Sequence, residues 1–159
     1  MGSQSKTDLA YIAGFLDGDG SVMLQIKKRK DGRLKKRFMC TICFYQDTRH
    51  ERDLFWIRNK LGIGYISRRN DGMTELRVNG FRQVRDILKS LLPYIRFKKL
   101  QSKALYSASE LLSSTELQRL TRQQLLRILR YILVIQNENY VTKRKKTKEE
   151  LSKMLDLTP

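Results

Sequence analysis

The stretch that decides this fold is AYIAGFLDGDGSV, residues Ala10–Val22. It begins inside a periodic segment that predicts a helix from about Thr7 to Gly18, with Thr7 or Asp8 as the N-cap. It ends in an extended run, so the helix is expected to pass almost directly into a strand. Two acids and several small residues therefore gather on the last turns of one helix.

Small residues mark one side of this expected helix. Ala10 and Gly14 lie one turn apart on the same face, and Ala13 lies beside them. Small side chains let a second backbone come close, which favours a tight contact between two helices. A helix packed inside its own monomer shows the same spacing, so the spacing alone leaves the partner of this face open.

The acids Asp17 and Asp19 stand at the C-terminal end of the helix, where the helix dipole disfavours negative charge. A cation held by Asp19 and by free carbonyl groups at the helix end would make this place favourable. Mg²⁺ prefers such hard oxygen ligands, usually one or two carboxylates together with phosphate and water. A plain turn of the D-G-D-G type is the alternative that the chemistry leaves open.

Two hairpins follow, each preceded by a helix. Extended runs are expected at Ser21–Lys30 and Arg33–Gln46 around Asp31-Gly32, and at 64–70 and 73–79 around Asp71-Gly72. Helices are expected at Thr48–Leu61, Phe81–Leu92, Lys99–Leu112, Arg122–Asn137 and Lys148–Leu155, the last two starting with capping boxes. The order α-β-β-α-β-β-α predicts an α+β fold with a four-stranded antiparallel sheet, helices on one face, and extra C-terminal helices.

This length fits a single domain, expected over residues 7–137. Residues 138–159 are expected to form a basic C-terminal tail with a short helix.

The expected strands carry apolar side chains on one face and polar ones on the other, because side chains alternate along a strand. Val22, Leu24 and Ile26 share the apolar face in the first run. The opposite face carries the residue types that read base edges in DNA, and a two-stranded ribbon fits the major groove. The expected DNA-binding residues are Gln25, Lys27, Arg29, Arg33, Lys35, Arg37, Thr41, Ser67, Arg69, Glu75 and Arg77. A solvated charged face is the plainer alternative.

Charge indicates the class of partner. Lys and Arg number 33 against 16 acids, which gives a formal net charge of +17. Nucleic acid is the leading partner because a basic protein gains affinity by releasing counterions from phosphates. Ribosomal and membrane-surface proteins show a similar balance. The basic run Lys143–Lys146 is expected to touch the phosphate backbone rather than to serve as a nuclear-import signal.

Cys40 and Cys43 form a C-x-x-C pair inside the apolar run RFMCTICFY, and no second Cys or His pair completes a zinc site. They are interpreted as buried strand thiols of a reducing compartment, ahead of a redox motif. No apolar run reaches the roughly 18 residues of a membrane span, and no signal-peptide pattern is recognised. These observations favour an intracellular protein, of an organelle or of a prokaryotic cytoplasm.

Taken together, AYIAGFLDGDGSV closely resembles the LAGLIDADG motif of homing endonucleases. The order of elements over about residues 8–104 is similar to that family's domain. No second copy of the motif is found, so the chain resembles the single-motif branch, whose members are homodimers. The resemblance implies that two motif helices pack on each other, here through Ala10, Ala13 and Gly14, and that the hairpins lie in the major groove of double-stranded DNA.

The resemblance also implies a set of site residues. Asp19, the last acid of the motif, and the carbonyl of Gly18 are implied as ligands of Mg²⁺, for which Mn²⁺ substitutes. Gln46 is implied to order the attacking water, and Lys98 to stabilise the phosphorane or activate solvent. A lysine that only contacts phosphate is the alternative for Lys98. The implied reaction is double-strand cleavage with short 3′ overhangs in a long, nearly palindromic target, which promotes intron homing.

One local departure and two other functions remain. Relatives often place an arginine shortly after the glutamine, where this chain has Arg49-His50-Glu51-Arg52 and the ungapped match falls on His50. That role stays open among Arg49, His50 and Arg52. An RNA-splicing maturase on the same fold needs no Asp19, and a non-catalytic DNA-binding regulator tends to lose this acid. Its presence favours the enzyme.

Overall fold

Helix α1 (Lys6–Asp19) runs into strand β1 (Gly20–Lys28) without a connecting loop, as the sequence predicts. The structure is a computed structural model that describes residues 3–31, 35–140 and 143–158. The N-cap of α1 is Ser5, whose hydroxyl accepts from the Asp8 amide while the Asp8 carboxylate accepts from the Ser5 amide. The expectation of Thr7 or Asp8 as N-cap is wrong, because Asp8 is the distal partner in a capping box.

The sheet has four antiparallel strands in the order β1-β2-β4-β3. The remaining strands are β2 (Lys36–Asp47), β3 (Tyr65–Arg68) and β4 (Met73–Asn79). In the first pair Gly20 faces Phe44 and Lys28 faces Lys36, and Arg77 of β4 lies between Cys43 and Tyr65. The predicted α+β class and antiparallel sheet are confirmed. Gly32, Arg33 and Leu34, expected in the first hairpin, lie outside the described residues.

The expected helix 48–61 is a 3-10 turn, η1 (Thr48–His50), followed by α2 (Arg52–Leu61). The other helices are α3 (Phe81–Leu91), α4 (Lys99–Ser114), α5 (Arg122–Glu138) and α6 (Lys148–Met154), with a second 3-10 turn, η2 (Leu117–Arg119), before α5. The predicted capping boxes at the starts of α5 and α6 are present. None of the described helices has both the length and the apolar character needed to cross a membrane.

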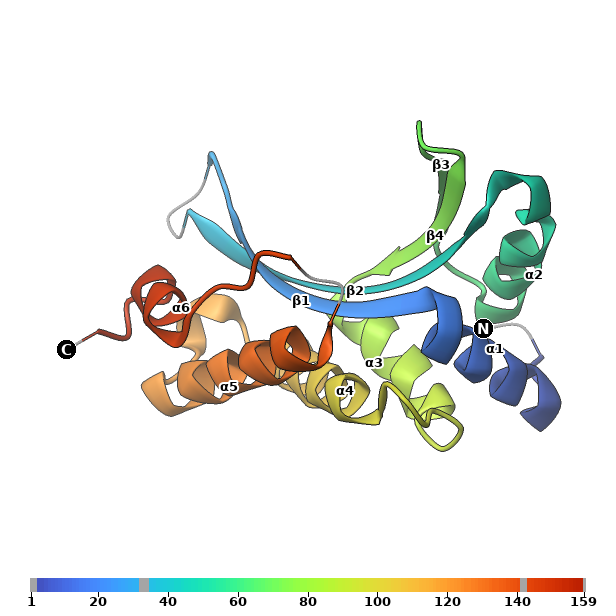
Figure 1. The fold of residues 1–159 in the computed structure, drawn as a ribbon. Helices are drawn as coiled ribbons and strands as arrows, with labels where there is room; N and C mark the ends of the chain where they lie inside the picture. The colour runs from blue at the N-terminus through green and yellow to red at the C-terminus, as the bar shows by residue number, and fades with distance from the viewer. Residues whose placement is uncertain (1–2, 32–34, 141–142, 159) are drawn as a thin grey trace.

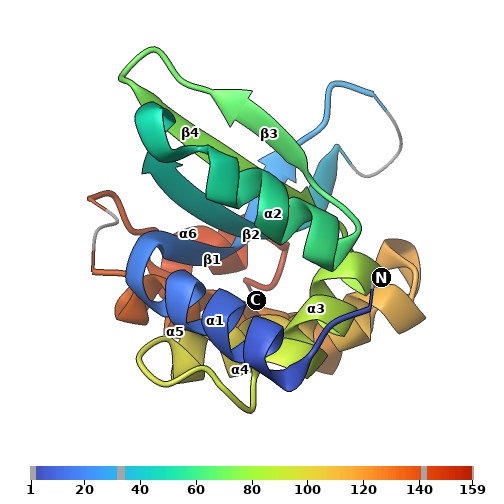
Figure 2. The same cartoon turned by 90° about the vertical axis from the view of Figure 1, so that its right-hand side faces the viewer.

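The sheet is curved, and the helices cover its convex side while its concave side stays open (Figure 1). Helices α1 and α2 lie side by side at one end of the sheet (Figures 1 and 2), where the Tyr11 and Trp56 rings meet edge to face and Lys60 pairs with Asp8. The core between sheet and helices holds alternate strand residues such as Val22, Leu24 and Ile26, all of which are buried. The predicted apolar face is therefore confirmed for β1.

The C-terminal segment packs on the domain. Leu151 of α6 and Leu157 belong to the apolar core, and Arg122 of α5 donates to the Leu157 carbonyl. Lys36 of β2 contacts the Met154 carbonyl and forms an ion pair with Asp156. The expected short helix is present, and its contacts join the end of the chain to the β1-β2 hairpin. Residues Lys143–Lys146 are exposed. The side-chain amide of Gln136 donates to the Lys146 carbonyl and accepts from the Lys146 backbone amide.

Cys40 and Cys43 are buried free thiols on opposite faces of β2. Burial raises the pKa of each thiol to about 11, which disfavours the reactive thiolate. The interpretation as buried strand thiols is confirmed.

Glu51 connects α2 to the second hairpin and is the most heavily bonded carboxylate of the domain surface. It accepts from the Arg68 guanidinium at 2.5 Å and from the Thr74 hydroxyl at 2.8 Å, and Thr74 is fully buried. The Arg68 and Thr74 donors lower the pKa of Glu51 from 4.5 to about 2. This carboxylate therefore stabilises the fold in its charged form.

We predict that Glu51→Gln lowers the thermal midpoint by a few degrees at neutral pH. Because the folded-state pKa is depressed, the stabilisation is fully present above about pH 4.5 and is lost as the pH falls towards 2. Calorimetry across this range should show the gap between the two proteins closing in acid. Glu110→Gln, at an exposed position of α4, serves as the control and should leave the midpoint unchanged at every pH. A gap that is constant with pH would contradict the assignment.

Candidate active site

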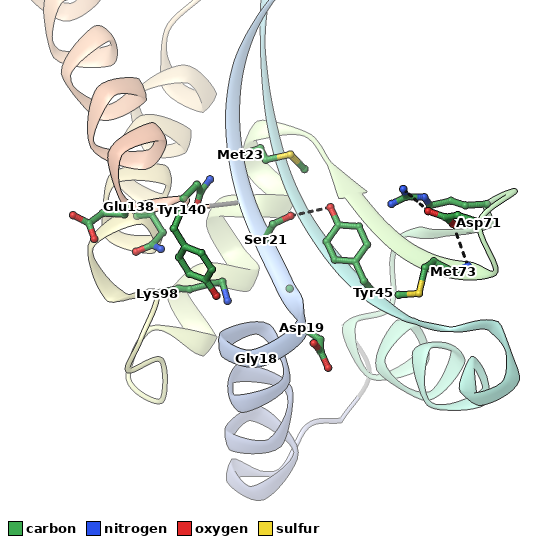
Figure 3. A pocket seen from close by; sticks show the side chains of 14 residues that line it. Gly18, Asp19, Ser21, Met23, Tyr45, Asp71, Met73, Lys98, Glu138 and Tyr140 are labelled. Atoms are coloured by element: carbon green, nitrogen blue, oxygen red, sulfur yellow. Dashed lines mark hydrogen bonds and ion pairs between the residues drawn. The ribbon is translucent and has the colours of Figure 1, made fainter. Parts of the chain in front are cut away.

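A pocket of about 560 Å³ opens where α1 passes into β1. Asp19 and Gly18 form one wall, Ser21 and Tyr45 lie on the strands, and Lys98 lies across from them. Figure 3 shows Lys98 and Tyr140 on one side of the start of β1, with Asp19 and Tyr45 on the other. The helix-to-strand junction and the start of α4 thus bring together an acid and a base that are far apart in sequence.

Asp19 presents an exposed carboxylate at the last residue of α1. Within the described parts of the chain its side chain has no hydrogen bond or ion pair. No basic residue occupies the last turn of α1, so the helix end keeps its negative character. An unpaired carboxylate at this position is poised to take a cation.

Lys98 is half-buried beside the two motif acids. Its ammonium contacts the backbone carbonyl of Asp17, and both Asp17 and Asp19 lie near enough to favour its charged form. Burial outweighs these carboxylates and lowers the pKa of Lys98 below its ordinary value. A lysine in this state gives up a proton more readily than a solvated one.

Asp17 holds the segment that carries Lys98. Its carboxylate accepts from the Arg96 amide at 2.7 Å and from the Lys98 amide at 2.9 Å. Lys98 is the N-cap of α4 and no side chain of α4 caps this helix, so Asp17 supplies the missing acceptor from another element. The first motif acid therefore acts on the backbone of α4, and sequence analysis assigned it no such role.

The donor set of one chain fits a hard divalent cation that also binds water and phosphate oxygens. No group of three or more His, Cys, Asp or Glu side chains is found among the described residues, so one chain offers Asp19 and backbone oxygens. Mg²⁺ accepts one or two carboxylates and completes its shell with water and phosphate oxygens. The unpaired Asp19 carboxylate beside free carbonyls at the end of α1 meets that requirement.

Gln46 lies near the end of β2, half-buried, and its side-chain oxygen accepts from the Asp47 amide at 2.9 Å. Among the described residues no hydrogen bond joins it to Asp19 or Lys98. Next to it, Asp47 forms a two-point ion pair with Arg49, which lowers the pKa of Asp47 to about 2. Arg49 is thus engaged in an ion pair although it is exposed, and His50 and Arg52 are exposed as well.

The concave face carries most of the residues expected to bind DNA. Register places Lys27 opposite Arg37 and Ser67 opposite Glu75, with these side chains on the open side of the sheet. Arg29 and Lys35 are exposed where the first hairpin leaves the sheet. Arg69 pairs with Asp71 at the far side of the pocket. Arg33 lies outside the described residues.

Besides Arg69, three of the expected DNA-binding side chains are already engaged inside the chain. Thr41 is fully buried and its hydroxyl donates to Asn79 at 2.7 Å, so it does not reach the surface as expected. Glu75 and Arg77 pair with each other, with side chains 12% and 24% exposed. Strand alternation predicts which face of the sheet a residue lies on, but not which side chains surround it there. On that face Thr41 is flanked by Met23 and Met39.

The outer face of α1 is open. Ala10 and Gly14 are exposed, and a Cβ added at Gly14 or Gly18 would meet nothing within 4 Å. A hollow of about 480 Å³ beside them reaches the exposed Phe97. Ala13, expected at the same contact, is fully buried and faces the core, because it lies a quarter turn from Gly14 towards the sheet.

Several residues of the pocket were not found by sequence analysis: Tyr45, Met23, Met73, Gln101, Asn139 and Tyr140. Strand alternation could have placed Tyr45 on the polar face, where its hydroxyl is 3.0 Å from that of Ser21. No local signal could have found Asn139, which reaches the pocket because its amide donates to the Val22 carbonyl of β1.

Comparison with known sequences finds one family. A profile described as LAGLIDADG endonuclease matches residues 12–108. The chain is 36% identical over 107 residues to the DNA endonuclease I-CvuI of Chlorella vulgaris, covering 67% of this chain and 66% of that protein. It is 28% identical over 112 residues to I-CreI of Chlamydomonas reinhardtii, covering 70% and 68%. The aligned segments thus span about two thirds of these relatives.

Comparison with solved structures extends the likeness to nearly the whole chain. The homing endonuclease I-CvuI, crystallised in complex with its target in the presence of calcium, matches with a TM-score of 0.82 and 28% identity over 95% of this chain and 94% of that one. The archaeal intron-encoded homing endonuclease I-Vdi141I, complexed with DNA, gives a TM-score of 0.80 at 21% identity over 96% and 97%, which shows the shared fold.

We predict that Asp17→Asn lowers the rate of DNA cleavage by about tenfold or more, because the segment that carries Lys98 loses a charged anchor and a misplaced catalytic group slows a reaction by this much. If Asp17 acts through Lys98, the same substitution in a Lys98→Ala background should add little. Single-turnover cleavage rates of the two single variants and the double variant measure this coupling. Effects that simply multiply would show that Asp17 serves only the general fold.

We predict that Gly14→Leu leaves the monomer folded and abolishes its self-association. The added side chain meets no atom of its own chain and removes a helical glycine, whereas it would hold off a second helix. Sedimentation velocity and thermal unfolding should be compared with Gln123→Leu, which adds the same side chain at an exposed position of α5. A Gly14→Leu protein that still dimerises would exclude this face as the contact.

Proposed function

The chain belongs to the LAGLIDADG endonuclease family, and from this we propose that it is a homing endonuclease that binds DNA as a homodimer and cuts both strands with divalent metal ions. The observation that carries the proposal is the unpaired Asp19 carboxylate in one pocket with Lys98, at the edge of an open, basic sheet face. A regulator or a maturase on this fold has no need for such a pair.

Dimerisation through α1 supports a complete active site. The exposed small residues Ala10, Gly14 and Gly18 recur every fourth position, so they form one stripe along the helix. Close packing of two such stripes about a two-fold axis that runs along the helices would bring the C-terminal ends of both helices together. The two Asp19 carboxylates would then lie close to each other, which supplies the second acid that one chain lacks.

Asp19 and the carbonyl of Gly18 would hold the cation, with Mg²⁺ as the expected ion and Mn²⁺ as a substitute. A bound cation polarises phosphoryl oxygens and lowers the pKa of the water that it binds. Lys98 would stabilise charge on the phosphate or take a proton, a task that suits its lowered pKa. Gln46 would order the attacking water by turning its amide from Asp47.

DNA would lie along the concave face of both sheets. Lys27, Arg29, Lys35 and Arg37 form the far end of the first hairpin and are open to a phosphate backbone or to base edges. The same face carries Gln25, Ser67 and Arg69. It also carries Glu75 and Arg77, which would contact DNA once their mutual ion pair opens. The basic run Lys143–Lys146 would add phosphate contacts.

Two-fold symmetry makes a long, nearly palindromic target the expected substrate, since each chain would read one half-site. Cleavage is proposed to leave short 3′ overhangs with 5′-phosphate and 3′-hydroxyl ends. The biological role that follows is insertion of a mobile intron into an allele that lacks it.

The proposal is tested by cleavage of a randomised double-stranded library with Mg²⁺, followed by sequencing of the cut ends. We expect cuts at one near-palindromic sequence, and loss of cutting in Asp19→Asn with DNA affinity in Ca²⁺ kept. Asp86→Asn, at an exposed carboxylate of α3 outside the pocket, is the matched control and should cut normally. Tight binding without cutting by any of the proteins would refute the enzyme and favour the regulator or the maturase.

A further inference from the structure

Gln101 is a buried polar side chain in the wall of the pocket that contains Asp19 and Lys98. It is 4% exposed, and its Oε1 has no hydrogen-bond partner among the described residues. A buried carbonyl oxygen without a donor destabilises the folded state, so such atoms are rare in proteins. A buried acceptor of this kind calls for an explanation, such as a catalytic role or a bound water.

The place of Gln101 in α4 explains why the oxygen is free. Gln101 is the third residue of the helix, where a glutamine side chain ordinarily reaches back to the amide of the N-cap. Gln124 does this in α5 of the same chain, accepting from the Thr121 amide at 2.9 Å. In α4 the corresponding amide, that of Lys98, donates to the Asp17 carboxylate instead. Asp17 therefore accepts from the amide that Gln101 would otherwise cap, and Gln101 lies in the wall of the pocket.

The Gln101 oxygen can only accept a hydrogen bond. The Lys98 ammonium, the lysine donor that lines the pocket, contacts the Asp17 carbonyl, and no hydrogen bond joins it to Gln101 among the described residues. Water is the donor that a hydrolytic site must order in any case. We propose that Gln101 is a further residue of the active site, and that its Oε1 accepts a hydrogen bond from a water molecule ordered beside Lys98 in the DNA complex. This inference rests on the proposed function.

Ser102 supplies an internal comparison. Its hydroxyl is also fully buried and has no partner among the described residues, and it is the next residue of the same helix. Ser102 does not line the pocket, so nothing places its hydroxyl near water or DNA. If burial without a partner were only a packing defect of α4, the two residues would behave alike when their polar atoms are removed.

The test compares Gln101→Met with Ser102→Ala. Methionine keeps the length of the side chain and removes the acceptor, so we expect the thermal midpoint to stay the same or rise by a few degrees. DNA affinity in Ca²⁺ should be unchanged, and single-turnover cleavage in Mg²⁺ should fall by about tenfold or more. Ser102→Ala should likewise keep or raise the midpoint but cut at the normal rate.

Two results would overturn the inference. One is a Gln101→Met protein that cuts as fast as the parent; the other is a loss of cutting that comes with a lower thermal midpoint, which is what a purely structural residue would give. The parent chain separates this inference from the proposed function. A parent that cuts no target with Mg²⁺ contradicts the function itself, whereas a cutting parent with an unaffected variant contradicts only the role of Gln101.

Discussion

The arrangement of the site depends on one carboxylate that is bonded to the backbone of a distant segment. Asp17 sits in the last turn of α1 and accepts from the amides of Arg96 and Lys98, which lie just before α4. Both its oxygens are used, so the end of α1 and the start of α4 are fixed relative to each other. Asp19, two residues further on, stays free because Asp17 is the acid that bonds to this segment.

The same contact settles the chemistry of the residues around it. Lys98 is held by its amide and by its ammonium, both on Asp17, and the burial that results lowers its pKa. The cap that Asp17 provides also leaves Gln101 without its usual local partner. The contacts of Asp17 thus determine the environment of Lys98 and of the buried Gln101 oxygen, both in the pocket that contains the unpaired Asp19.

The open sheet and the open helix face have a common cause. All helices lie on the convex side of the sheet (Figure 1), so the concave face and the outer face of α1 remain uncovered. Gly14 and Gly18 leave room for another backbone along α1, and the charged side chains of β1 and β2 leave a basic surface along the sheet. A monomer that leaves two such surfaces open is suited to bind a second copy of itself and a polyanion.

The sequence by itself determined the family, the order of elements and the face that each strand turns to the core. These features depend on local periodicity and on a motif of fixed length, both of which can be read within a few residues. The match over residues 12–108 confirms the family, and the structure confirms the order of elements. The position of Asp19 at the end of the motif helix could also be read from the sequence, and its exposure is a finding of the structure.

Only the tertiary structure decided which polar groups form hydrogen bonds within the chain and which stay available. Asp17 meets amides about eighty residues away, Thr41 is covered and bonded to Asn79, and Ala13 turns to the core while Gly14 does not. Hydrogen bonds between distant segments follow from how elements pack, and no local pattern records them. For that reason the motif predicted where chemistry occurs, whereas packing decided which of its residues are free to perform it.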